Sequence, residues 1–128
     1  MSYHFSKTLA LPFDQALARG DRSPKAGRLR HPDGQDVKAT LKSKLGEDFR
    51  AYRILGACNP PLAFRALQVE DKIGTMLPCN VIVQEDQRGG VEVSAVDPVA
   101  SMQAIHNADL AKVAKEVQTK LKRVVEGL

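Results

Sequence analysis

The chain has 128 residues, of which 43% are hydrophobic and 27% charged, as expected for one globular domain with its own core. The formal net charge of +4 comes without a cluster of lysine and arginine interleaved with aromatic residues, so nucleic-acid binding is not favoured. No apolar run reaches the length that crosses a membrane, and the N-terminus lacks the apolar stretch of a signal peptide, so we expect a cytoplasmic protein with no membrane partner.

The first third of the chain predicts a strand, a helix and then a long loop. Residues 3–9 alternate between apolar and polar side chains, which indicates a strand. Residues 12–19 have the apolar spacing of an amphipathic helix. Residues 20–35 contain one large apolar side chain, Leu29, among many turn-forming residues, so we expect an anomalous loop-like segment there.

The middle of the chain predicts a helix and two strands. Apolar residues spaced i, i+4 and i+8 over 37–45 indicate a helix that Asp36 caps and Gly46 ends. Residues 53–58 are a short apolar run that begins with a β-branched side chain, and residues 80–85 are rich in β-branched side chains; both patterns are typical of buried strands.

A short helix is predicted between these two strands. Asn59 can cap it with its side-chain oxygen, and Pro60 and Pro61 suit the first helical turn, where a missing N–H costs nothing. Residues 62–67 then place apolar side chains on one face.

The last third predicts a hairpin and a long helix. Residues 86–90 connect the strand at 80–85 to an alternating strand at 91–96, and residues 99–106 form a short helix or ordered turn. Asn107 caps the last helix, whose apolar stripe consists of Leu110, Val113, Ala114, Val117, Leu121, Val124 and Val125. We therefore predict an α+β fold: a single domain over residues 1–128, with a mainly antiparallel sheet covered by helices and a long C-terminal amphipathic helix.

Two cysteine turns are the chemical feature that stands out. Cys58 ends one predicted strand and Cys79 opens the next, so antiparallel pairing would bring the two thiols close together. Both can be small buried apolar residues in a reducing compartment. Alternatively, the N-terminus of the following helix stabilises a thiolate at Cys58. The candidate ligand or redox site consists of Cys58, Asn59, Pro60, Pro78, Cys79 and Asn80.

Other chemistry has weaker support in the sequence. A metal site would need the two cysteines to be joined by His4, His106 or Asp97, and no spacing in the chain demands it. The sequence contains no nucleophile elbow, phosphate-binding glycine loop or H-E-x-x-H motif. We therefore assign no catalytic residue, metal ligand or cofactor, and an enzyme is not favoured.

Several stretches resemble one family. Residues 36–41, 52–63, 77–83 and 96–98, with the helix over 107–128, resemble the domain-of-unknown-function 302 family. The resemblance covers residues 1–19 and 36–128, and the two cysteine turns are its specific part. It implies a small α+β domain that forms a homodimer, and it implies no established activity.

Residues 20–35 depart from the family pattern, which has the rest of the first helix there and then a strand of the Gly-Phe-Gly-Ile-Leu kind. Read one base downstream with permitted third bases, this segment can give Val-Thr-Glu-Ala-Leu-Lys-x-Glu-Gly-Phe-Gly-Ile-Leu-Thr-Asp. Our hypothesis is a pair of compensating frameshifts in the gene or in its sequencing; the alternative is a basic loop particular to this lineage.

These observations lead to three hypotheses of function. The first is a ligand- or partner-binding homodimer with its site at the two cysteine turns and a small molecule as its ligand. The second is a thiol-dependent redox or sulfur-handling protein that uses Cys58 as the nucleophile and Cys79 as the resolving thiol. The third is a metal-binding protein.

Overall fold

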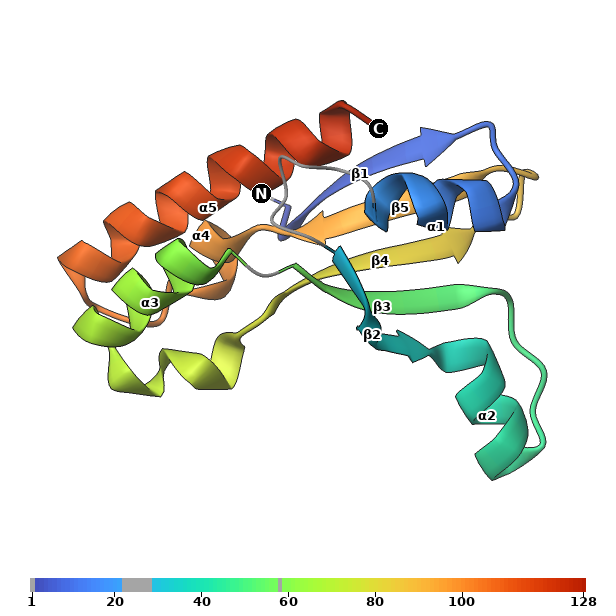
Figure 1. The fold of residues 1–128 in the computed structure, drawn as a ribbon, viewed down its shortest axis with the longest axis horizontal. Helices are drawn as coiled ribbons and strands as arrows, with labels where there is room; N and C mark the ends of the chain where they lie inside the picture. Colours follow the sequence, from blue (N-terminus) through green and yellow to red (C-terminus); the bar gives the residue numbers. More distant parts are fainter. Residues whose placement is uncertain (1, 22–28, 58) are drawn as a thin grey trace.

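A five-stranded sheet with helices makes up the domain. The computed structural model describes residues 2–21, 29–57 and 59–128. The elements in chain order are β1 (His4–Leu9), α1 (Phe13–Asp21), β2 (Leu29–Asp36), α2 (Val37–Leu45), β3 (Tyr52–Ala57), α3 (Pro60–Val69), the 3₁₀ helix η1 (Asp71–Met76), β4 (Cys79–Glu85), β5 (Val91–Val96), α4 (Pro98–Ser101) and α5 (Ala108–Glu126). Figure 1 shows α5 running along one side of the molecule and α2 projecting from the corner beside β2 and β3.

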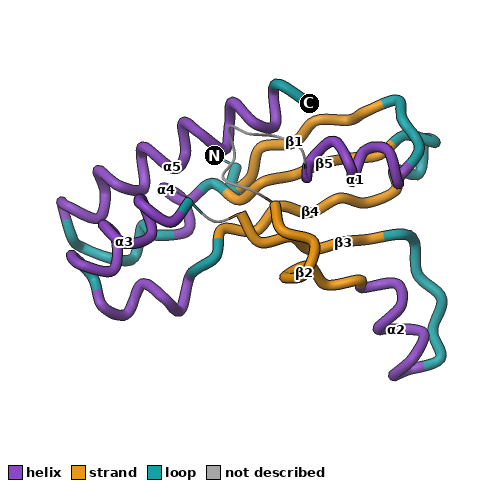
Figure 2. The backbone as a smooth tube through the Cα atoms, in the orientation of Figure 1, coloured by secondary structure: helices purple, strands orange, loops and turns teal. Residues whose placement is uncertain are grey.

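The strands lie in the order β1-β5-β4-β3-β2, and every neighbouring pair is antiparallel. The tube in Figure 2 shows this sheet, with α3 and α4 beyond one of its ends and α5 running from there back along the sheet beside β1. The predicted α+β class, the antiparallel sheet and the long C-terminal helix are confirmed.

The main core lies on one face of the sheet. Cross-strand neighbours on this face, such as Val83 and Val93, are almost completely buried because side chains alternate along each strand. Leu17 of α1 and Leu121 of α5 pack against them. The opposite face carries a chain of polar side chains, in which Ser6 Oγ lies 2.7 Å from Ser94 Oγ.

A second core lies beyond the end of the sheet. It joins α3, η1 and the first half of α5 through residues such as Leu62, Ile73 and Val113. Leu77 and Val117 are partly buried and pack against both cores. The domain therefore has two apolar clusters that α5 spans.

Residues 20–35 differ from the expected loop. The helix α1 continues to Asp21, and Leu29–Asp36 is a strand paired with β3, so the expectation of a loop is wrong for residues 29–35. The register is irregular between Arg30 and Gln35, a stretch that contains Pro32, which has no N–H to donate. The backbone thus has the order, helix then strand, that the resemblance implies for this region, although its residues depart from that pattern.

The helix α2 is confirmed, with Asp36 accepting a hydrogen bond from the Ala39 N–H and Gly46 in the left-handed region at φ 67°. No residue of α2 is buried, and Leu45 is 68% exposed. The spacing of apolar residues therefore identified the helix, but its apolar side chains do not contribute to either core.

At Gly56, β3 passes close to Pro78. A Cβ atom on Gly56 would lie 2.9 Å from Cγ of Pro78, whose ring is fixed to the backbone. We expect Gly56→Ala to lower the free energy of unfolding by about 1–3 kcal/mol, as measured by urea denaturation. Gly74→Ala is the matched control, because a Cβ there meets nothing within 4 Å. Equal stability of the two variants would contradict the close approach.

Candidate functional site

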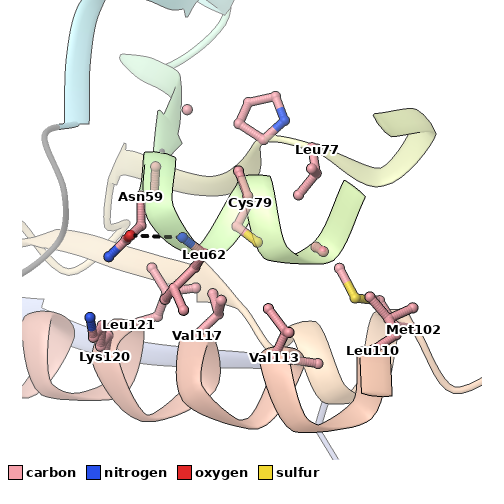
Figure 3. Close-up of a pocket in the computed structure, with 16 residues that line it drawn as sticks. Asn59, Leu62, Leu77, Cys79, Met102, Leu110, Val113, Val117, Lys120 and Leu121 are labelled. Carbon is pink, nitrogen blue, oxygen red and sulfur yellow. Dashed lines mark hydrogen bonds between the residues drawn. The ribbon is translucent and has the colours of Figure 1, made fainter. Parts of the chain in front are cut away.

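A cavity of about 570 Å³ lies between α3, α5 and the ends of β3 and β4 that carry the cysteine turns. Figure 3 shows α3 above it and α5 below it. Its walls are formed by Gly56, Ala57, Asn59, Leu62, Ala63, Ala66, Leu77, Pro78, Cys79, Met102, Leu110, Val113, Ala114, Val117, Lys120 and Leu121. Thirteen of these sixteen residues have no polar side-chain group; Asn59, Cys79 and Lys120 are the others.

The ends of β3 and β4 form one wall of the cavity. Because β3 and β4 run antiparallel, Ala57 at the end of β3 pairs with Cys79 at the start of β4. Asn59, two residues after Ala57 in the sequence, caps α3, and its Oδ1 accepts a hydrogen bond from the Leu62 N–H at 3.3 Å. The short connection therefore sets α3 directly beside the end of the sheet.

The apolar stripe of α5 forms the facing wall. Leu110 and Val113 belong to the second core, whereas Leu121 belongs to the main core. The cavity lies where these two cores meet, beside the bridging residues Leu77 and Val117. The cavity is thus a gap in the packing between the main core and the second core, whose own residues are buried.

Two polar links hold α3 and α5 together. Arg65 donates hydrogen bonds to both oxygens of Glu116, at 2.9 and 3.1 Å. These bonds lower the pKa of the Glu116 carboxyl, so the ion pair is present at neutral pH and is lost when acid protonates Glu116. Asn107 caps α5 and donates from Nδ2 to the carbonyl of Val69 at 2.8 Å. The walls of the cavity are thus fixed by contacts outside it.

The structure brings together three of the six predicted site residues. Asn59, Pro78 and Cys79 line the cavity, and Cys79 is buried. Pro60 and Asn80 are exposed and do not line it.

Cys58, the sixth, lies outside the described residues.

The first turn of α3 offers no free N–H group to a thiolate. Pro60 and Pro61 have no N–H, the Leu62 N–H is bound to Asn59 Oδ1, and the Ala63 N–H is bound to the Asn59 carbonyl at 2.9 Å. No N–H of residues 60–63 is left for a neighbouring group. Asn59 accepts from the two N–H groups that this proline-containing turn has, so the first turn of α3 adds no support to the redox hypothesis.

The partners suggested for a metal site have other roles. Asp97 caps α4 and accepts from Nε2 of Gln118 at 3.0 Å, and Nδ1 of His4 lies 2.7 Å from Oγ of Ser6. His106 is exposed. Among the described residues, no three side chains of His, Cys, Asp or Glu form a group that could hold a metal ion.

Lys120 is the site residue that the sequence reasoning missed. It is not part of the predicted apolar stripe of α5, yet it lines the cavity. The signal was available: Lys120 lies seven residues after Val113 and three after Val117, which puts it at the edge of the apolar stripe. A basic residue at that position is placed to reach the end of an apolar cavity.

A polar cluster on the open face of the sheet was also missed. Ser94 is buried, and its Oγ lies 2.7 Å from Oγ of Ser6 and 3.4 Å from Oε1 of Glu92. Gln84 donates to the same carboxylate oxygen at 3.3 Å. These groups satisfy one another's hydrogen bonds, which explains a buried serine in a strand.

Comparison with known proteins agrees with this fold. The model of the family described as Domain of unknown function DUF302 matches residues 5–128. The crystal structure of an uncharacterized conserved protein DUF302 from Bacillus stearothermophilus is similar, with a TM-score of 0.85, 21% identity and coverage of 98% of each chain. No protein with curated function matches. Within the described residues, no helix has the length and apolar character needed to cross a membrane.

The burial of Cys79 leads to a prediction about its reactivity. Its residue is 5% exposed, so in a Cys58→Ser variant we expect the one remaining thiol to react with iodoacetamide far more slowly in the folded protein than in urea. Mass spectrometry of timed samples measures both rates. Similar rates in the two states would contradict the burial of Cys79.

Proposed function

This chain belongs to the DUF302 family, whose description states no activity, and from its site we propose that it is a binding domain for a small apolar molecule. The observation that carries the proposal is the apolar cavity between α3, α5 and the ends of β3 and β4. Its volume of about 570 Å³ lies within the range of cavities that bind small molecules.

The composition of the walls supports binding rather than catalysis. A site for a small molecule commonly has mostly apolar walls and a few polar groups that orient the ligand. Here Asn59, Cys79 and Lys120 are those groups. We assign no residue to a chemical step.

The test uses the fully folded chain and 1-octanol, a small apolar probe. We expect its addition to shift the methyl resonances of Val113 and Met102, which line the cavity, in a heteronuclear NMR spectrum. Ala63→Phe places a ring in the cavity and should lower the affinity for 1-octanol at least tenfold, which corresponds to about 1.4 kcal/mol.

The matched control is Ala111→Phe, which makes the same change at an exposed position of α5 that does not line the cavity. It should bind 1-octanol as the native chain does. The proposal is overturned if the native chain shows no shifts at cavity methyl groups, or if both variants bind equally well.

Thiol chemistry is the second candidate function. The pairing of Ala57 with Cys79 supports it, because Cys58 is the next residue in the chain after Ala57. The two cysteines would then act as a reversible pair, with Cys58 as the nucleophile. Two observations favour ligand binding over this candidate: Cys79 is buried, and residues 60–63 have no free N–H group to stabilise a thiolate.

We further propose that the chain forms a homodimer through α2. Isolated helices shorter than about 12–15 residues are marginal in water, and α2 has nine residues with none buried. Leu41 and Leu45 lie one turn apart on the same face, and Leu45 is 68% exposed. If this face of α2 packs against a second copy of the chain, the contact buries apolar side chains that belong to neither core of the domain.

The test of this contact is sedimentation velocity of the native chain and two variants. We expect a dimer for the native chain and for Ser43→Glu, and a shift toward monomer for Leu45→Glu. Both variants add one negative charge to an exposed position of α2, so only the loss of the apolar side chain separates them. A native monomer, or a Leu45→Glu variant that remains dimeric, would refute the contact.

A further inference from the structure

We infer that the ligand of this cavity is an amphiphile with an apolar body and one carboxylate head, bound by Lys120 and Asn59. The inference rests on the proposed function and adds the chemical class of the ligand. It follows from the uneven distribution of polar groups along the cavity.

The cavity has one polar end and one apolar end. Figure 3 shows the side chains of Asn59 and Lys120 together at one end, with Met102 and Leu110 at the other. Val113 and Val117 line the length between them. A molecule that fills this space therefore meets apolar walls along its body and nitrogen donors at its head.

Asn59 presents a donor with a defined direction. Its Oδ1 is the acceptor that caps α3, and this fixes which atom of the amide is oxygen. Among the described residues, its Nδ2 has no hydrogen-bond partner. The same side chain can therefore cap the helix with its oxygen and donate to a ligand with its nitrogen.

Lys120 supplies the positive charge. It is the charged residue among those that line the cavity, and no carboxylate of the described residues lies within ion-pair distance of it. Glu116, one turn earlier on α5, binds Arg65 through both of its oxygens and interacts with Lys120 through its charge alone. The ammonium group is thus available to a ligand.

The solvent face of α5 beside the cavity is also basic. A shallow depression on the solvent side of α5 shares Lys120 with the cavity and is further lined by Lys112, Lys115 and Arg123. Glu116, which is paired, is the acidic residue there. Such a surface raises the local concentration of anions at the polar end.

A head with a single negative charge fits these groups better than a phosphate. One ammonium and one neutral amide balance one charge, whereas phosphate sites at helix N-termini use several free N–H groups. The first turn of α3 has none to offer, because Pro60 and Pro61 lack the N–H and Leu62 donates to Asn59. A carboxylate needs no more than the two donors present.

The experiment compares octanoate with 1-octanol, which has the same chain length and no charge. Titrations followed by NMR should show that the native chain binds octanoate about tenfold more tightly, as expected for a charge-assisted hydrogen bond. Lys120→Met should remove this preference, so that the variant binds octanoate and 1-octanol with equal affinity. Because the ion pair is near solvent, added salt should reduce the preference in the native chain.

Two further variants separate binding from stability. Asn59→Asp keeps a side-chain oxygen to cap α3 but replaces the donor with a negative charge, so it should weaken the binding of octanoate relative to 1-octanol and leave the unfolding temperature unchanged. Lys112→Met removes a charge from the basic depression outside the cavity and should keep the preference for octanoate.

The outcomes distinguish this inference from the proposed function. Equal affinities for octanoate and 1-octanol in the native chain, or a preference that survives Lys120→Met, would overturn the carboxylate assignment while leaving a cavity that binds apolar molecules. If neither compound shifts the cavity methyl groups, the proposed function itself is wrong, and the assignment of the head group with it.

Discussion

One face of α5 packs against two apolar clusters, and the arrangement of the remaining elements follows from this contact. A helix of 19 residues is about 28 Å long, which is enough to reach from the sheet to the helices beyond its end. Leu121 and Val125 are buried in the main core, and Leu110 and Val113 in the second. Because a single rigid helix serves both clusters, their separation is fixed, and a cavity remains where neither fills the space between them.

Much of the fold could be predicted from the sequence because the signals were local. Val91, Val93 and Ala95 alternate with polar residues and are all buried on one face of β5, as strand periodicity requires. Asn107 caps α5, whose apolar stripe is buried along most of its length. The antiparallel pairing that the cysteine argument assumed for the two strands is likewise present, since Ala57 pairs with Cys79.

Features that depend on contacts with residues far away in the sequence could not be predicted from local patterns. The strand β2 forms from residues with almost no apolar pattern, because pairing with β3 supplies backbone partners that composition does not reveal. The helix α2 has apolar spacing but no buried residue, because its place in the fold sets it away from both cores. The role of Lys120 required knowing that α3 lies opposite α5, which only the tertiary structure provides.

If the gap between the two cores binds a ligand, as we propose, then its occupancy is coupled to folding. A molecule bound there, and not to the unfolded chain, would raise the free energy of unfolding by about 2.7 kcal/mol at a hundred times its dissociation constant. In a cell, changes of this size alter the fraction of chains open to proteases and hence the steady-state amount of a protein. Under this proposal, the supply of the ligand would set how long each copy of the protein survives, and the abundance of the protein would follow that supply.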